Sequence, residues 1–190
     1  MNAYKAKEIV DEIFFLYEQH GADDYIGEPV SQIEHMCQAA QLAEAEGFDE
    51  DVILAAFFHD IGHLCEHVMT VGDMNGYGVT DHELLAGTYL RDKGFSEKIA
   101  RLVENHVEAK RYLTYKDPAY YNKLSEASKM TLEQQGGRMD EIEAGFFEQD
   151  SLHQLFIKMR VWDDLAKEMN KPLPALDKYK EMALRHLIEQ

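Results

Sequence analysis

An apolar helix that ends in two ionisable residues is the strongest constraint in this sequence. The stretch from Asp49 to about Leu64 has helical periodicity, and its centre, 52–58, is apolar on every side. Such a helix must be surrounded by other elements, so we expect it to be the most buried one. His59 and Asp60 follow this centre directly. Because burying an uncompensated carboxylate costs several kcal/mol, the pair needs a strong partner, and a divalent metal is the most economical one.

The rest of the chain also has helical periodicity, with only four prolines in 190 residues. We predict further helices at 3–20, 31–47, 80–94, 96–110, 122–135, 140–148, 151–169 and 175–190. Ser31 with Glu34, and Thr80 with Glu83, have the spacing of a capping box at a helix start. Since no repeat or low-complexity linker interrupts the pattern, we predict an all-α, single-domain helical bundle over residues 1–190.

The charge balance excludes several classes of partner. The chain has 36 Asp and Glu against 19 Lys and Arg, a net charge of −17, which repels nucleic-acid backbones and anionic membranes. No apolar run approaches the roughly 18–20 residues that span a bilayer, and the N-terminal residues contain no apolar signal-peptide core. We therefore expect no nucleic-acid partner, no membrane and a cytoplasmic location, in which Cys37 and Cys65 stay free thiols.

Three further histidines, His35, His82 and His106, lie in predicted helices beside apolar neighbours. Each one alone is typical of an ordinary core or surface histidine. Together with His59 and Asp60 they distribute four imidazoles and a carboxylate over four helices, which suits a metal centre inside a bundle.

A late aspartate is a candidate sixth ligand. Asp163 follows Trp162 in a predicted helix whose apolar face would turn it inward. Asp164, the next residue, is the competing candidate, and spacing alone does not separate the two.

The order of these residues resembles the metal-dependent HD-domain superfamily, most of whose members are phosphohydrolases. The resemblance extends to the HD-domain mixed-valent di-iron oxygenases that cleave carbon–phosphorus bonds in phosphonate breakdown, which are relatives of the myo-inositol oxygenases. It includes residues 24–35 and 105–116 and covers most of the chain. It implies an HD-domain helical bundle around a dinuclear metal centre, in which the ligands are His35, His59, Asp60, His82, His106 and Asp163.

The resemblance also implies the cofactors and the reaction. Two iron ions form a mixed-valent Fe(II)/Fe(III) pair, with O2 as co-substrate. One iron takes His35, His59, Asp60 and Asp163, and the other takes Asp60, His82 and His106, so that Asp60 bridges. This ligand set leaves the irons incompletely coordinated, and substrate and oxygen need such open positions. The implied reaction is oxidative cleavage of the small-molecule phosphonate 2-amino-1-hydroxyethylphosphonate to glycine and phosphate.

Several polar residues are candidates for substrate binding. A phosphonate dianion inside an acidic protein needs local positive charge, and Lys110 lies one helical turn after His106 on the same face. His63, one turn after His59, is a candidate hydrogen-bond donor. The resemblance adds the hydroxyls of Ser128 and Thr131, whose residue types alone indicate only a polar surface.

A loop ahead of the first ligand helix holds the candidate catalytic residues Tyr25 and Glu28, and Gly27 between them permits movement. In the resembling oxygenases the tyrosine fills a metal position until substrate displaces it. The glutamate then contacts the substrate amine or hydroxyl. Without the resemblance, a loop acid such as Glu28 would be expected to be solvated.

Three other functions compete with this one. The first is a phosphohydrolase of the same superfamily that uses a metal-activated water. The second is a non-catalytic metal or small-molecule sensor. The third is the same chemistry on the trimethylammonio analogue, because quaternary ammonium groups favour aromatic cages whereas a primary amine favours a carboxylate such as Glu28 or Glu126. Candidates for the cage are Tyr112, Tyr115, Tyr120 and Tyr121.

Overall fold

The computed structural model describes residues 1–25, 27–74, 76 and 78–190. Over these residues the regular structure is helical, and the only β pairing consists of the isolated bridges Asp24–Ser31 and Asp73–Val79. The predicted all-α fold class is confirmed. The helices are α1 (Ala3–His20), α2 (Gln32–Ala45), α3 (Glu50–Phe58), α4 (Ile61–Leu64), the 3-10 helix η1 (Cys65–His67), α5 (His82–Asp92), α6 (Glu97–Glu104), α7 (His106–Lys116), α8 (Pro118–Lys123), α9 (Glu126–Gln134), α10 (Glu141–Gln149), α11 (His153–Leu165) and α12 (Asp177–Glu189).

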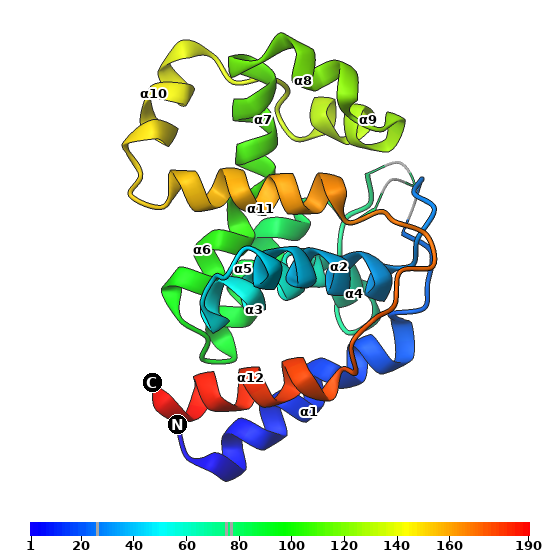
Figure 1. Cartoon of the computed structure of the whole chain (residues 1–190), viewed down its shortest axis with the longest axis vertical. Helices are drawn as coiled ribbons and strands as arrows, with labels where there is room; N and C mark the ends of the chain where they lie inside the picture. Colours follow the sequence, from blue (N-terminus) through cyan, green and yellow to red (C-terminus); the bar gives the residue numbers. More distant parts are fainter. Residues whose placement is uncertain (26, 75, 77) are drawn as a thin grey trace.

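The helices are arranged in three tiers (Figure 1). Helices α2, α3, α5 and α6 pack together in the middle, and α11 crosses over α2 and α7. Helices α1 and α12 lie side by side beneath them, which brings the two termini close together. Helices α8, α9 and α10 lie at the opposite end of the molecule, next to α7. The middle tier therefore has the first and last helices of the chain on one side and helices from residues 118–149 on the other.

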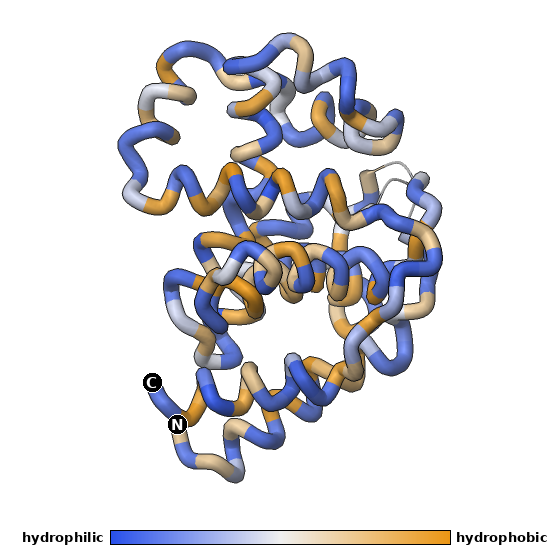
Figure 2. Tube along the Cα trace, in the orientation of Figure 1, coloured by the Kyte–Doolittle hydropathy of each residue, from blue (hydrophilic) through white to orange (hydrophobic). Residues whose placement is uncertain are grey.

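The hydrophobic core extends from the lower tier through the middle tier to α11, α7 and α10. Every residue of the apolar centre of α3 is buried, as its sequence predicts. The ring of Phe57 stacks on Phe14 of α1 and on Tyr179 of α12, with centroids 5.6 and 4.4 Å apart. Hydrophobic positions recur along each long helix and alternate with hydrophilic ones, as expected for amphipathic elements around this core (Figure 2).

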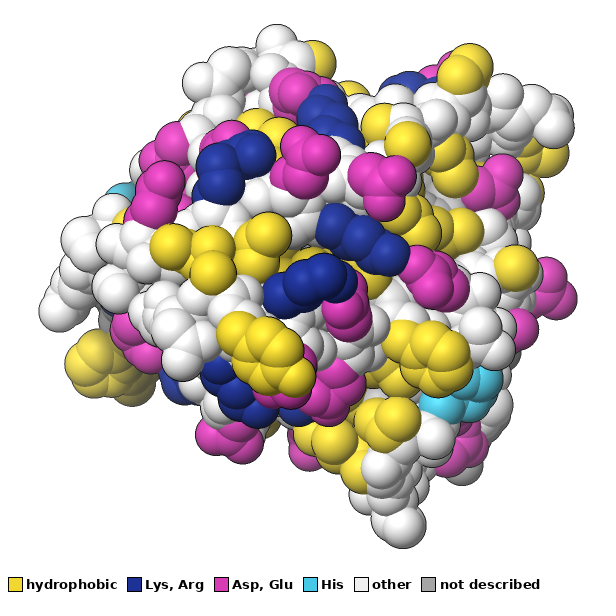
Figure 3. Space-filling model, turned by 90° about the horizontal axis from the view of Figure 1, so that it is seen from below, with side chains coloured by type: hydrophobic (Ala, Val, Ile, Leu, Met, Phe, Trp, Pro, Cys, Tyr) yellow, Lys and Arg dark blue, Asp and Glu magenta, His cyan; other side chains and the backbone are white. Residues whose placement is uncertain are grey.

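The surface is charged and mixed. Seen from the side of α1 and α12, acidic and basic side chains are interspersed with apolar ones (Figure 3). None of the described helices is long and apolar enough to cross a bilayer. Cys37 and Cys65 are buried free thiols, as predicted, and burial raises their pKa values to about 12 and about 11.

The predicted helix starts are partly correct. Ser31 and Glu34 form the expected capping box, in which Glu34 N–H donates to the Ser31 hydroxyl and its carboxylate accepts from Ser31 N–H. The prediction of a capping box at Thr80 and Glu83 is wrong. Helix α5 starts after Asp81, whose backbone is left-handed (φ 51°) and whose side chain makes no cap hydrogen bond. Glu83 is instead buried beside His82.

Three predicted helices are each interrupted in the structure. The helix expected at 49–64 ends at Phe58 and restarts at Ile61, because Asp60 leaves helical geometry (φ −107°, ψ 13°). The helix at 96–110 is broken at Asn105, which separates α6 from α7. The helix at 122–135 is broken at Leu124, whose extended backbone (φ −63°, ψ 144°) separates α8 from α9. The first two interruptions lie beside His59, Asp60 and His106 and redirect those side chains.

Candidate metal centre

Five elements bring the six predicted ligands together in the interior. His35 comes from α2, His59 and Asp60 from the interruption between α3 and α4, and Asp163 from α11. His82 and His106 are the first residues of α5 and α7. All six side chains are buried. They form two adjacent groups of possible ligand atoms, which are His35 with His59 and Asp163, and Asp60 with His82 and His106.

The carboxylate of Asp60 lies between two pairs of imidazoles. Its Oδ2 is 3.4 Å from Nε2 of both His35 and His59. Its Oδ1 is 3.3 Å from Nε2 of His82 and 3.4 Å from Nε2 of His106. One oxygen therefore faces each pair, which is the arrangement of a carboxylate that bridges two metal ions.

The donor set fits two metal ions better than it fits a hydrogen-bond network. Bonds of ~2.0–2.2 Å to a common ion place ligand atoms roughly 3–3.5 Å apart, and the imidazole–carboxylate separations at Asp60 fall at the upper end of that range. Nε2 of His35 and His59 face each other at 3.0 Å, and Nε2 of His82 and His106 at 3.2 Å. Buried Oδ2 of Asp60 has no hydrogen-bond partner among the described residues. Such an atom is costly to bury unless something else binds it.

Backbone carbonyls orient three of the four imidazoles. Nδ1 of His59 donates to Ala56 O at 2.8 Å, and Nδ1 of His106 donates to Val103 O at 2.7 Å. Each acceptor lies three residues earlier, in the helix that ends at the interruption. Nδ1 of His35 donates to Ala166 O at 3.0 Å. Each carbonyl therefore holds a ring proton on Nδ1 and turns Nε2 toward the centre, which is the orientation that a metal requires.

The electrostatics keep both acids ionised, as metal ligands must be. Burial opposes the charge of Asp60, but the surrounding imidazoles, His59 first, hold its pKa well below the usual range. Burial likewise opposes the charge of Asp163, and the guanidinium of Arg160 lowers its pKa below the usual value. Burial lowers the pKa of His106 to about 3, so this ring is neutral at physiological pH.

A cavity of about 60 Å³ lies against this centre. Asp60, His82, His106 and Asp163 form part of its wall. The structure brings all the predicted substrate-binding residues to the same cavity, and they are Tyr25, Glu28, His63, Lys110, Ser128 and Thr131.

Lys110 is a buried cation in the wall of this cavity. Its ammonium donates to the hydroxyl of Thr131 at 3.0 Å and also to the side-chain oxygen of Gln135. Only 2% of the residue is exposed, and burial, with a smaller contribution from Arg160, lowers its pKa to about 7. Lys110 is therefore enclosed by the protein and is not a solvated surface lysine.

His63 is a neutral hydrogen-bond donor to the cavity. Val79 N–H donates to its Nδ1 at 3.2 Å, so the ring carries its proton on Nε2. Burial and the neighbouring His82 ring, on which it stacks at 4.1 Å, lower its pKa to about 3.

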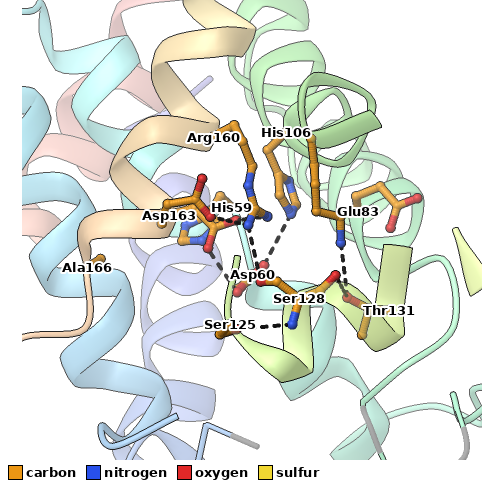
Figure 4. Close-up of polar contacts among 12 residues, drawn as sticks. His59, Asp60, Glu83, His106, Ser125, Ser128, Thr131, Arg160, Asp163 and Ala166 are labelled. Carbon is orange, nitrogen blue, oxygen red and sulfur yellow. Dashed lines mark hydrogen bonds and ion pairs between the residues drawn. The ribbon is translucent and has the colours of Figure 1, made fainter. Parts of the chain in front are cut away.

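A second buried cation, Arg160, was not predicted from the sequence. One of its terminal nitrogens donates to Asp163 at 2.7 Å, and the other donates to the Ser128 hydroxyl at 3.3 Å and to Asp164. Figure 4 shows the guanidinium between Asp163 and Ser128. Its sequence signal is a basic residue three positions before Asp163 on the inward face of α11. That position becomes meaningful only once Asp163 is placed at the centre.

The two neighbouring aspartates of α11 have different surroundings. Oδ1 of Asp163 lies 3.5 Å from Nε2 of His35, within one of the two ligand groups. Asp164 instead bonds Arg160 and accepts from the hydroxyl of Tyr120. The geometry therefore favours Asp163 as the ligand and assigns Asp164 to holding Arg160.

The loop between α1 and α2 covers the centre. The Tyr25 ring stacks on the His35 imidazole, with centroids 4.1 Å apart, and burial, with the charge of Asp60, raises its pKa well above the usual value. The carboxylate of Glu28 pairs with Lys167 at 2.7 Å, and 8% of its side chain is exposed. The expectation of a solvated loop acid is wrong for Glu28, because Lys167 holds it inside.

The residues weighed for recognition of a substituted amine lie elsewhere. Tyr112, Tyr115, Tyr120 and Tyr121 are not among the described residues of the cavity wall. The hydroxyl of Tyr120 donates to Asp164 and accepts from Arg160. The side chain of Glu126 is 89% exposed and pairs with Lys129.

Comparison with known proteins places this centre in a family. The HD-domain family model matches residues 33–148. The chain is 47% identical to uncharacterized protein L432 of Acanthamoeba polyphaga mimivirus, over 95% of this chain and 82% of that one. It is 37% identical to the 1-hydroxy-2-(trimethylamino)ethylphosphonate dioxygenase (glycine-betaine-forming) of Leisingera caerulea, over 87% and 84% of the two chains. It is also 37% identical to the hydroxymethylphosphonate dioxygenase of Gimesia maris, over 90% and 85%. The chain belongs to the HD-domain family and is a relative of its phosphonate dioxygenases.

Proposed function

We propose that this protein is a di-iron dioxygenase that cleaves the carbon–phosphorus bond of a small 1-hydroxyphosphonate, with 2-amino-1-hydroxyethylphosphonate as substrate and glycine and phosphate as products. The observation that carries the proposal is the composition of one cavity. Metal-ligand side chains form one part of its wall, and two buried cations, Lys110 and Arg160, form another. The names of the two dioxygenase relatives support the same chemistry.

Two irons held by the six ligands would supply the activation of oxygen and the redox chemistry. The chain itself binds and orients the substrate. Lys110 and Arg160 neutralise a phosphonate dianion that the net charge of −17 would otherwise repel. The Nε2–H of His63 and the hydroxyls of Ser128 and Thr131 complete a set of donors around the phosphonate oxygens.

Tyr25 and Glu28 close the cavity from the loop side. Tyr25 lies over His35 and must move before a substrate can reach the metal centre. Glu28 has a second carboxylate oxygen that is not engaged in its pair with Lys167, and we assign that oxygen to the substrate amine. The four tyrosines considered for a cage lie outside the described cavity wall, which favours the primary amine over the trimethylammonio group.

The direct test is oxygen uptake by iron-reconstituted protein given 2-amino-1-hydroxyethylphosphonate, with glycine and phosphate assayed in the same tube. We expect oxygen loss and release of both products in equal amounts. Hydroxymethylphosphonate and the trimethylammonio analogue serve as parallel substrates. Faster turnover of either compound would identify it as the better substrate and would leave the proposed dioxygenase reaction unchanged. Phosphate release from a phosphate ester without oxygen uptake would reject the dioxygenase in favour of a phosphohydrolase.

A pair of glycines tests the role of His63. Both Gly76 and Gly78 have positive φ (83° and 107°), so alanine costs each about 1–2 kcal/mol of backbone strain. At Gly78 the added Cβ would lie 2.6 Å from Cε1 of His63, whereas at Gly76 no atom of the described residues would lie within 4 Å. We expect Gly78→Ala to raise KM for the phosphonate about tenfold, as for one lost hydrogen bond to a charged group. Gly76→Ala should leave KM unchanged, and equal KM values in the two variants would contradict a substrate contact by His63.

A further inference from the structure

Two imidazoles and a carboxylate meet at the surface, outside the metal centre. His20 is the last residue of α1, and His67 is the last residue of η1. Asp23 lies on the loop that leads from α1 to Tyr25. One nitrogen of each ring and one oxygen of Asp23 lie within 4.8 Å of one another. None of the three residues is among the described residues that line the cavity.

The distances between the imidazole nitrogens and the carboxylate are close to those of the buried centre, but the ring orientation differs from the edge-on and tilted pairs found there. His20 Nδ1 and His67 Nε2 both lie 3.7 Å from the same oxygen, Oδ2 of Asp23. The two rings are stacked, with centroids 3.5 Å apart and an interplanar angle of 5°. A nitrogen–oxygen separation of this length is too long for a hydrogen bond. It is only slightly longer than the 3.4 Å between His35 and Asp60 in the metal centre.

The backbone holds these residues in place while leaving them open to solvent. Asp23 O accepts from Gln32 N–H at 3.0 Å, and Gly21 O accepts from Ile33 N–H at 2.7 Å, so the loop is fastened to the start of α2. The side chains of His20, His67 and Asp23 are 31%, 29% and 59% exposed. Water can therefore complete the coordination of an ion bound there.

We propose that His20, Asp23 and His67 form a second, surface site for a divalent transition metal of the Zn²⁺ type. Two imidazoles and one carboxylate suit zinc, whereas magnesium and calcium prefer all-oxygen sets. The carboxylate of Glu66, 3.8 Å from His67 Nε2, adds negative charge beside the site. The overall charge of −17 raises the local concentration of cations further.

A metal at this site would join two parts of the cavity wall. The loop 21–31 carries Tyr25 and Glu28, and the segment formed by α4 and η1 begins just after Asp60 and carries His63. In the described part of the chain, Asp23 and His67 connect these two segments at the surface. The bound ion therefore fastens the loop that covers the metal centre.

The test measures zinc uptake and loop exchange in iron-loaded protein. Samples are dialysed against chelator-buffered Zn²⁺, and zinc and iron are quantified together. We expect one added zinc ion per chain with iron unchanged, no uptake of Mg²⁺, and slower hydrogen exchange of residues 21–31. His67→Ala should weaken zinc binding at least about tenfold, since even outer-shell partners of metal ligands contribute that much, and should abolish the slower exchange.

The matched control is His153→Ala, which removes a partly exposed imidazole at the start of α11. It should bind zinc as the unmodified protein does. His20→Ala removes a second ligand. Because His67 lies at the exposed end of a short helix, His67→Ala is the variant least coupled to folding. Equal zinc affinity in His67→Ala and the unmodified protein, or zinc uptake only in exchange for iron, would overturn the site. Zinc binding without slower exchange would overturn the fastening of the loop.

Discussion

Asp60→Asn is expected to empty both metal positions and to lower oxygen-dependent turnover by about 10³-fold or more. Each carboxylate oxygen of Asp60 faces one pair of imidazoles. An amide keeps one oxygen and turns a non-ligating NH2 group toward the other pair. The iron content of the reconstituted variant and its oxygen uptake measure the effect.

Two neighbouring substitutions are the controls for Asp60→Asn. Asp163→Asn removes a ligand from only one of the two groups and should lose one iron of the two. Asp164→Asn leaves both groups intact and should keep both irons, while binding substrate more weakly because Arg160 loses a partner. Retention of two irons by Asp60→Asn would contradict the bridging role. Equal iron loss at positions 163 and 164 would contradict the choice of Asp163.

Lys110→Met is expected to lower kcat/KM for the phosphonate by about 10²–10³-fold, because truncating one partner of a buried charge pair costs roughly 2–5 kcal/mol. Iron content should not change, since Lys110 belongs to neither ligand group. Lys116→Met is the matched control, because Lys116 lies on the same helix with half of its side chain exposed and pairs with Glu148. A similar loss in both variants would contradict a specific phosphonate contact by Lys110.

The pH dependence of the same residue gives a second readout. Burial lowers the pKa of Lys110 to about 7, so its positive charge is lost as the pH rises through that value. The unmodified protein should therefore lose kcat/KM above about pH 7, and Lys110→Met should lack this limb. The unfolded chain holds this proton up to the ordinary lysine pKa of about 10.4. Below pH 7 the buried ammonium therefore lowers the free energy of unfolding by its full amount. The melting temperature of Lys110→Met at pH 6 should thus be no lower than that of the unmodified protein.

Periodicity predicted the helical class and the burial of α3, since a segment that is apolar on all sides must be enclosed. It did not predict the interruptions at Asp60 and Asn105. Each of these residues is compatible with a helix, and only tertiary contacts make the helix end there. The Thr80–Glu83 spacing failed for a related reason. Glu83 is drawn into the interior beside His82, so it is not available to cap the helix start.

The residues of the site likewise include some that the sequence could predict and one that it could not. The residues that the structure gathers around Asp60 could be predicted, because adjacent imidazole and carboxylate groups at the end of an apolar helix are costly to bury without a metal. Arg160 could not, because a single arginine in an amphipathic helix usually faces solvent. Its burial depends on Asp163, Asp164, Tyr120 and Ser128 meeting from three separate helices.

The carbonyls that orient His35, His59 and His106 belong to residues 166, 56 and 103, which take part in these hydrogen bonds through main-chain atoms only. These three residues are buried in the core, so a substitution there keeps the acceptors in place only if it also keeps the local backbone in place. Lys110, Arg160, Ser128 and Thr131 instead line the cavity with side chains that one substitution removes. A single substitution can therefore change the donors that line the cavity while three rings of the centre keep their orientation.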